Sequence, residues 1–203
     1  MTRLLLIRHA EPDEDARGRC YGRLDVGLSP RGLASAERLA ESLENVVLDV
    51  VHVSPRLRAV QTAAALCGTP TVDDRLRELD FGRLEGRTYE EIEREEPELF
   101  RRWMETPTLV RFPGGESYAD LRKRVASAVA DVVAANSERT VALVSHGGVI
   151  RAALAVVLGL PDERAFSLDV GYARVSVVDW FAASPVVRLV NGVSADLPAE
   201  LGG

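Results

Sequence analysis

The sequence contains almost no lysine. Lys123 is its only lysine, so nearly all of its 25 basic residues are arginines. Schiff-base formation and P-loop phosphate binding both depend on a lysine side chain, so neither is expected unless Lys123 supplies it. Lys123 lies in a helical pattern of polar and apolar residues, which predicts a surface position. Any anion that this protein binds is therefore expected to meet guanidinium groups.

Cysteine is also scarce, and long apolar runs are absent. Cys20 and Cys67 are far apart in the sequence, and neither belongs to a CxxC pair or a Cys/His cluster. This usage is typical of a reducing, cytoplasmic compartment and predicts neither a disulfide framework nor a metal site. The first apolar run, residues 4–7, is too short for a signal peptide, and no later run is long enough to span a membrane.

The residues that are present fit one globular domain, residues 1–203. The 203 residues are 46% hydrophobic and 28% charged, which is ordinary for a soluble domain with a full core. The net charge of −6 argues against nucleic acid or an anionic membrane as the main partner. A small anionic substrate stays compatible with it, because a few arginines can dominate one pocket. The sequence gives no oligomeric state, and a homodimer is compatible with it.

Strand-like apolar runs alternate with helical patterns along the chain. This alternation predicts an α/β fold with a mostly parallel central sheet covered by helices. Residues 173–181 and 186–190 are expected to form two closing strands that could pair with each other. The other expected strands are residues 4–7, 47–54 and 140–146. A helix is expected over residues 30–43, with Ser29 as its cap and Pro30 in its first turn. The other expected helices are residues 55–66, 90–104 with a break near Pro97, 117–136 and 147–158.

Polar residues gather where these strands end, which is where such sheets carry their functional groups. Arg8 and His9 directly follow the first strand. Arg58 lies just beyond the second strand, and His146 lies at the end of the strand at residues 140–146. The third histidine, His52, lies inside a strand and is expected to be half-buried structure. Taken alone, Arg8 and His9 have two interpretations. They could be solvated residues at the point where a strand reaches the surface. They could also be a nucleophile and an anion-binding cation that the strand positions in a pocket.

Five sequence blocks favour the second interpretation. They occur in order between residue 3 and about residue 151, and they resemble the signatures of the histidine phosphatase superfamily, which includes cofactor-dependent phosphoglycerate mutases. The resemblance implies a phosphoglycerate mutase-like, three-layer α/β/α sandwich and a phosphomonoester hydrolase that needs neither metal nor cofactor. The blocks are LLLIRHAE with Arg8 and His9, SPRLRAVQTA with Arg58, LRELDFGRLEG with Glu78, FPGGES, and VSHGG with His146.

The resemblance also implies a role for each matched residue. His9 would attack phosphorus in line and form a phosphohistidine, while its other ring nitrogen donates to a backbone carbonyl. Glu78 would protonate the leaving oxygen and then deprotonate the attacking water. The phosphoryl oxygens would be held by the planar guanidinium groups of Arg8 and Arg58, by His146, and by the Gly147 amide at a helix start.

Three positions depart from the family pattern. Ala10 replaces the usual glycine of the first block, and the added methyl group would matter only in a tightly packed loop. Pro12 and Asp15 occupy places where many members carry Thr or Ser and a phosphate-binding Asn. A carboxylate at residue 15 would repel phosphate, so no phosphate contact is assigned to Asp15.

The segment GRCYGRLDVGLSPRG carries the best indication of the substrate. It resembles a stretch of the α-ribazole 5′-phosphate phosphatases, enzymes of cobalamin nucleotide-loop assembly. FPGGES followed by a long helix fits the same group. This resemblance makes α-ribazole 5′-phosphate a candidate substrate and Arg23 a candidate substrate-binding residue.

Two other functions stay open. A phosphoglycerate mutase would use the same His9 but return the phosphoryl group to a sugar acid. The tail NGVSADLPAELGG contains no basic residue to hold a polyanionic bisphosphoglycerate, which favours hydrolysis. A catalytically silent phosphate-binding protein ranks last, because candidates for all five core residues are present.

Overall fold

The fold is built around one six-stranded sheet, and a computed structural model describes it over residues 1–193. The strands are β1 (Thr2–Arg8), β2 (Val50–Val53), β3 (Thr71–Val72), β4 (Thr140–Ser145), β5 (Val175–Trp180) and β6 (Pro185–Gly192). Their order in the sheet is β3-β2-β4-β1-β5-β6. The pairs β2–β3, β2–β4 and β1–β4 are parallel, whereas β5 runs antiparallel to β1 and β6. The prediction of a mostly parallel sheet closed by two paired strands is therefore confirmed.

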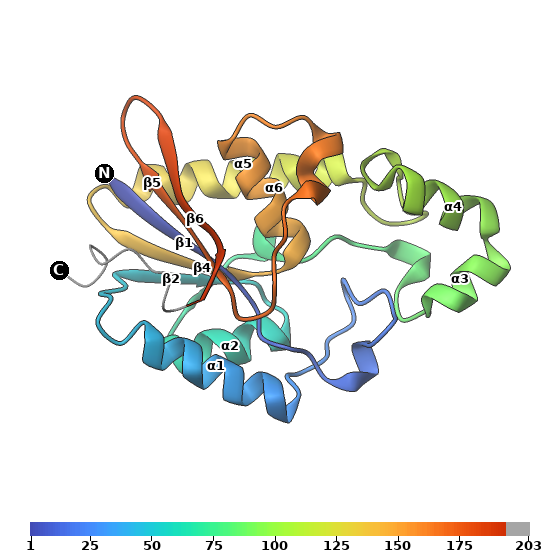
Figure 1. Ribbon diagram of the computed structural model, residues 1–203, viewed down its shortest axis with the longest axis horizontal. Helices are drawn as coiled ribbons and strands as arrows, with labels where there is room; N and C mark the ends of the chain where they lie inside the picture. Colours follow the sequence, from blue (N-terminus) through green and yellow to red (C-terminus); the bar gives the residue numbers. More distant parts are fainter. Residues whose placement is uncertain (194–203) are drawn as a thin grey trace.

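Helices cover both faces of this sheet (Figure 1). They are α1 (Pro30–Ser42), α2 (Leu57–Leu66), α3 (Tyr89–Glu95), α4 (Pro97–Glu105), α5 (Tyr118–Ala135) and α6 (Gly147–Val157). α1 and α2 lie on one face and α5 and α6 on the other, which gives the predicted three-layer α/β/α sandwich. α3 and α4 extend beyond the ends of the parallel strands. Among residues 1–193, no helix combines the length and the hydropathy needed to cross a bilayer.

The side chains of β1 are buried on both faces of the sheet. Leu4 and Leu6 belong to the core between the sheet and the helices α5 and α6. Leu5 and Ile7 belong to the core on the side of α1 and α2. Alternate residues of a strand point to opposite faces, so a continuous apolar run marks a strand that is covered on both sides. Because all four side chains are at most 3% exposed, the end of β1 is rigidly positioned.

The helix starts follow capping rules that the sequence shows. Ser29 caps α1 ahead of Pro30, as predicted, and its Oγ accepts the backbone N–H three residues on at 2.9 Å. Thr88 and Ser117 form capping boxes at α3 and α5. The predicted break near Pro97 is confirmed, because Pro97 is the first residue of α4. Proline fits that position because a backbone N–H in the first turn of a helix has no acceptor within the helix, so its absence costs nothing.

The structure departs from the sequence-based expectations at three places. The second strand begins at Val50 and not at residue 47, and Val47 is 76% exposed. The edge strand β3 is not predicted, because its two residues are exposed and form no apolar run. The helix expected from residue 55 begins at Leu57, and Arg56 is its N-cap residue. Each difference lies at the edge of the sheet or at the end of an element, where tertiary packing rather than the local sequence pattern determines the secondary structure.

Candidate active site

Three parallel strands end side by side at one edge of the sheet. The last residue of β1 pairs with the last residue of β4, and the last residue of β2 pairs with the residue before it in β4. The residues that follow these strands are His9, His146 and Ser54, and each is at most 1% exposed. The rings of His9 and His146 meet edge to face, with centroids 5.1 Å apart. The sheet therefore brings together two histidines that are far apart in the sequence.

The backbone holds His9 in one orientation. Its N–H donates to the Ser145 carbonyl at 2.8 Å, and its Nδ1 lies 2.7 Å from the Ala10 carbonyl oxygen. A carbonyl can only accept, so Nδ1 carries the proton and Nε2 keeps its lone pair. Burial, followed by the charges of Arg58 and Arg8, holds the pKa of His9 well below 6.5. The ring is therefore neutral near pH 7, the state in which imidazole is a nucleophile.

Arg58 is a fully buried cation in the first turn of α2. Its Nη1 donates to the Leu24 carbonyl at 2.9 Å, and its Nη2 donates to the Tyr21 and Gly22 carbonyls at 2.8 and 3.3 Å. Burial lowers the pKa of Arg58, yet a guanidinium stays charged at any pH of interest. Its Nε has no hydrogen-bond partner in the described part of the chain. Backbone carbonyls thus fix both Nη atoms of Arg58, and its Nε–H stays available as a donor.

Arg8, the last residue of β1, is held by the loop before β5. Its Nη1 donates to the Val170 carbonyl at 2.5 Å, and its Cζ lies 3.9 Å from the centroid of the Tyr172 ring. A Cβ at Gly147 would lie 3.3 Å from the Cζ of Arg8 and 3.0 Å from Nη1 of Arg151. The lack of a side chain at residue 147 thus lets two guanidinium groups approach the first turn of α6, where backbone N–H groups point outward.

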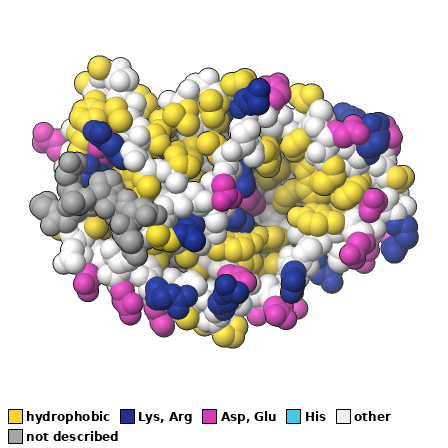
Figure 2. Space-filling view, viewed as in Figure 1, with side chains coloured by type: hydrophobic (Ala, Val, Ile, Leu, Met, Phe, Trp, Pro, Cys, Tyr) yellow, Lys and Arg dark blue, Asp and Glu magenta, His cyan; other side chains and the backbone are white. Residues whose placement is uncertain are grey.

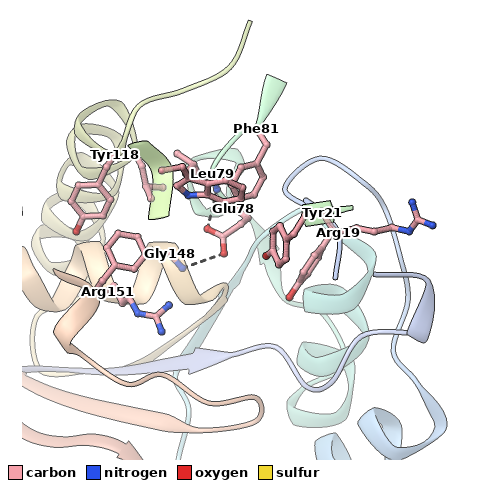
Figure 3. A pocket seen from close by; sticks show the side chains of 12 residues that line it. Arg19, Tyr21, Glu78, Leu79, Phe81, Tyr118, Gly148 and Arg151 are labelled. Atoms are coloured by element: carbon pink, nitrogen blue, oxygen red, sulfur yellow. Dashed lines mark hydrogen bonds between the residues drawn. The ribbon is translucent and has the colours of Figure 1, made fainter. Parts of the chain in front are cut away.

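Glu78 is tied to the same helix start (Figure 3). Its Oε1 accepts the Leu79 N–H at 2.9 Å, and its Oε2 accepts the Gly148 N–H at 3.1 Å. A Cβ at Gly148 would lie only 2.3 Å from Oε1, so the carboxylate fits because residue 148 is glycine. The Arg124 side chain fixes the backbone of Glu78 by donating to its carbonyl oxygen at 3.0 Å. The amide of Gly148 thus holds the Glu78 carboxylate. The role predicted for the Gly147 amide concerns the phosphoryl group and stays a prediction.

Two tyrosines complete the wall around His9. The Tyr172 ring centroid lies 5.4 Å from that of His9, and the Tyr21 ring centroid lies 5.0 Å from the Cζ of Arg58. Their hydroxyl oxygens are 2.8 Å apart and share a hydrogen bond. Sequence reasoning missed both residues. Tyr21 lies inside the segment GRCYGRLDVGLSPRG, which carries the best sequence indication of the substrate, whereas Tyr172 has no recognisable signal in the sequence.

A cavity of about 220 Å³ opens beside Glu78. The Glu78 carboxylate points into it, whereas the Arg19 guanidinium points away (Figure 3). Figure 2 shows a hollow near the middle of this face, with charged side chains inside and hydrophobic side chains along its rim. The aromatic residues that line the cavity are Tyr21, Phe81, Tyr89, Trp103, Tyr118 and Phe166. The cavity thus offers flat apolar walls next to one carboxylate.

Three residues that the sequence analysis considers lie outside this cluster. The Arg23 side chain is 54% exposed, pairs with Asp80 at 3.5 Å, and lines neither of the two cavities described here for residues 1–193. Asp15 is exposed at a second, larger hollow that also reaches Arg8. His52 is half-buried in β2, as expected. Over residues 1–193, no group of three or more His, Cys, Asp and Glu residues is arranged to hold a metal ion.

Comparison with known proteins gives a family over almost the whole chain. Residues 4–192 match the histidine phosphatase superfamily (branch 1). The chain is 37% identical over 195 residues to Phosphoserine phosphatase 1 of Hydrogenobacter thermophilus, which covers 94% of this chain and 92% of the relative. It is 32% identical over 209 residues to "Probable phosphoglycerate mutase GpmB" of Enterobacter sp. (strain 638), which covers 98% and 97%. The crystal structure of the alpha-ribazole phosphatase from Shigella flexneri aligns with a TM-score of 0.86 at 27% identity, over 94% of this chain and 96% of that one.

These similarities confirm the predicted fold and the predicted enzyme class, a phosphomonoester hydrolase. The family match spans every element that carries the His9 cluster. The chain therefore belongs to the histidine phosphatase superfamily, branch 1.

Proposed function

We propose that the protein hydrolyses a small phosphate monoester through a phosphohistidine formed on His9. A set of unused nitrogens around His9 carries this proposal. Nε of Arg8, Nε of Arg58 and Nδ1 of His146 are buried and have no hydrogen-bond partner among residues 1–193. A buried polar group left unpaired costs about 1–3 kcal/mol. A phosphoryl group presents three oxygens, so it would pair with all three nitrogens at once.

The proposed reaction has two steps. In the first, Nε2 of His9 bonds to phosphorus while the ester P–O bond breaks, and Glu78 gives its proton to the departing alcohol oxygen. In the second, Glu78 takes a proton from a water that attacks phosphorus, the N–P bond breaks, and inorganic phosphate leaves. Arg8 and Arg58 would stabilise the charge on the phosphoryl oxygens in both steps, together with the amide of Gly147.

The aromatic cavity supports a substrate whose alcohol carries a planar ring. Stacking a ring on these walls would bury apolar area worth about 25 cal/mol per Å². This favours α-ribazole 5′-phosphate, whose alcohol bears an aromatic base, over small charged alcohols. The similarity to the Shigella flexneri alpha-ribazole phosphatase supports the same choice. The proposal then includes a cytoplasmic role in cobalamin assembly. A homodimer also stays a prediction, which sedimentation analysis would test.

Phosphoserine is the second candidate substrate. One relative is named a phosphoserine phosphatase, and Arg151 lines the cavity beside Glu78. The Nε of Arg151 donates to the Leu168 carbonyl at 2.9 Å, which leaves the outer guanidinium nitrogens available to a substrate carboxylate. A phosphoglycerate mutase is the third candidate. The sequence argument against it used the C-terminal tail, of which residues 194–203 lie outside the described residues.

A panel of phosphate monoesters tests the proposal. Initial phosphate release would be measured from α-ribazole 5′-phosphate, phosphoserine and 3-phosphoglycerate, the last with and without 2,3-bisphosphoglycerate. We expect hydrolysis with the highest kcat/KM for α-ribazole 5′-phosphate, and a phosphoenzyme after quenching at alkaline pH, where phosphohistidine is stable. His9→Ala should abolish both, whereas His52→Ala, at a half-buried histidine away from the cluster, should keep them.

Two results would contradict the proposal. Isomerisation of 3-phosphoglycerate that depends on 2,3-bisphosphoglycerate would support a mutase. Phosphate binding without turnover or a phosphoenzyme would support a silent binding protein. A preference for phosphoserine would keep the reaction and replace only the substrate.

A further inference from the structure

Ser54 is a fully buried residue to which the phosphatase reaction above gives no role. It follows β2 directly, next to the strand end that carries His146. Its Oγ lies 2.7 Å from Nε2 of His146, and both side chains are fully buried. The same Oγ accepts the backbone N–H of Arg56 at 3.4 Å. The other ring nitrogen of His146, Nδ1, has no partner among residues 1–193.

The direction of the bond between Ser54 and His146 follows from the number of protons available. A hydroxyl has one proton to donate. Among the described residues, Nε2 of His146 is the only acceptor within reach of the Ser54 hydroxyl. If the ring donated to Ser54 instead, the hydroxyl proton would be left buried without an acceptor, which is costly. Ser54 therefore donates, and Nε2 of His146 accepts.

The charge state of His146 sharpens this conclusion. Burial, followed by the neighbouring His9 and by Arg58 and Arg8, holds the pKa of His146 well below 6.5, so the ring is neutral near pH 7. A neutral imidazole carries one proton, on one nitrogen only. With Nε2 accepting from Ser54, that proton lies on Nδ1.

We propose that Ser54 is a positioning residue that fixes the tautomer of His146, so that Nδ1–H donates to the phosphoryl group. This inference rests on the proposed phosphatase function. Without the hydroxyl, the neutral ring could carry its proton on Nε2 and turn a lone pair toward an anionic oxygen, which would repel it. Ser54 thus selects between a donor and an acceptor at the same place in the site.

The tautomer can be measured directly by nitrogen NMR on protein labelled with ¹⁵N-histidine. Protonated and unprotonated ring nitrogens have well-separated ¹⁵N shifts, so each nitrogen of His146 can be classified. We expect a protonated Nδ1 and an unprotonated Nε2 in the wild type, and a gain of the Nε2-protonated form in Ser54→Ala. A wild-type ring protonated on Nε2 would overturn the inference, and so would a tautomer that Ser54→Ala leaves unchanged.

Kinetics supply the second readout. Loss of one donor to a developing anion typically costs 10²–10³-fold in kcat, and this is expected for His146→Ala. Ser54→Ala should lose less, about 10- to 100-fold in kcat/KM, because part of the ring population still presents Nδ1–H. Ser54→Thr or Ser54→Cys, whichever folds, should recover activity relative to alanine because each restores a donor. An alanine variant as active as the wild type would contradict the inference.

Ser145 offers a matched control. It is also a buried serine at a strand end, but its Oγ donates to the Leu76 carbonyl at 2.6 Å and not to a ring. Ser145→Ala and Ser54→Ala should both lower the melting temperature, but in Ser145→Ala the His146 tautomer should stay as in the wild type. Equal changes of tautomer in both variants would show a general loss of packing and refute the role of Ser54. The NMR result needs no turnover, so it separates a failure of this inference from a failure of the phosphatase proposal, which His9→Ala tests.

Discussion

Replacing Gly148 by alanine would displace the Glu78 carboxylate without disturbing the fold. The added Cβ would lie 2.3 Å from Oε1 of Glu78 and 3.2 Å from its Cδ. Its third neighbour is Leu121 at 3.4 Å, which is an ordinary contact. The carboxylate must therefore retreat by roughly 1 Å, while the rest of the core stays in place. Alanine also favours a helix over glycine by about 1 kcal/mol, so the variant is expected to fold.

The size of the effect follows from the proposed role of Glu78. A positioned general acid contributes about 10²–10⁴-fold to the rate, equivalent to roughly 3–5 kcal/mol of barrier. An alkyl alcohol needs that proton to leave, whereas p-nitrophenolate leaves readily without it. Gly148→Ala should thus lower kcat/KM about 100-fold or more for an alkyl phosphate, and less than about 10-fold for p-nitrophenyl phosphate.

Steady-state kinetics with the two classes of ester would measure this difference. Gly68→Ala is the matched control, because a Cβ there meets no atom within 4 Å, and its kinetics should equal those of the wild type. Glu78→Gln should show the same dependence on the leaving group as Gly148→Ala. Equal losses on both esters, or no loss on either, would refute the assignment of Glu78 as the proton donor.

Three further predictions concern the same site. The free energy of unfolding should fall as the pH drops below about 6.5, because the unfolded chain binds protons at His9 and His146 that the folded protein excludes. With two histidines, the free energy of unfolding can change by about 2.7 kcal/mol per pH unit. A melting temperature that does not change between pH 6.5 and 5 would contradict this prediction. Tyr172→Ala should lower kcat/KM by about 2- to 30-fold by removing a cation–π contact to Arg8 worth about 0.5–2 kcal/mol, whereas Tyr172→Phe should keep most of the activity. Treatment with EDTA should leave the rate of hydrolysis unchanged, and a loss that added metal restores would count against a reaction carried by side chains alone.

Local patterns in the sequence predict most of the elements that position the site. The apolar run at residues 4–7, the capping serine at residue 29 and the proline at residue 97 each act within a few residues of the chain, and the structure confirms all three. Strand ends can be predicted as well, because a buried strand becomes polar where it leaves the core. For this reason His9 and His146 can be recognised as candidate site residues from the sequence alone.

The residues that sequence reasoning missed depend on contacts between distant segments. Tyr172 reaches the ring of His9 from the loop before β5, and no local pattern reports which strand β5 joins. Ser54 could be seen as part of a motif, but its bond to His146 depends on the pairing of β2 with β4. Arg23 shows the opposite failure, because its segment resembles a specificity region while its side chain pairs with Asp80 at the surface.

The antiparallel direction of β5 brings one connection of the chain over both the phosphoryl-binding arginine Arg8 and the cavity for the alcohol. An antiparallel strand enters the sheet at the edge where its parallel neighbours leave it, so the connection before β5 passes directly over the site. Residues 158–174 form this connection between α6 and β5, and they supply Phe166 and Tyr172 without contributing to the ladder between β1 and β4. Val170 and Tyr172 of this connection hold Arg8, whereas Phe166 lines the cavity beside Glu78. Exchanging only residues 158–167 would therefore change which alcohols are accepted while Arg8 keeps its place. Those residues are the ones to randomise when a library is built to redirect this enzyme toward a new ester.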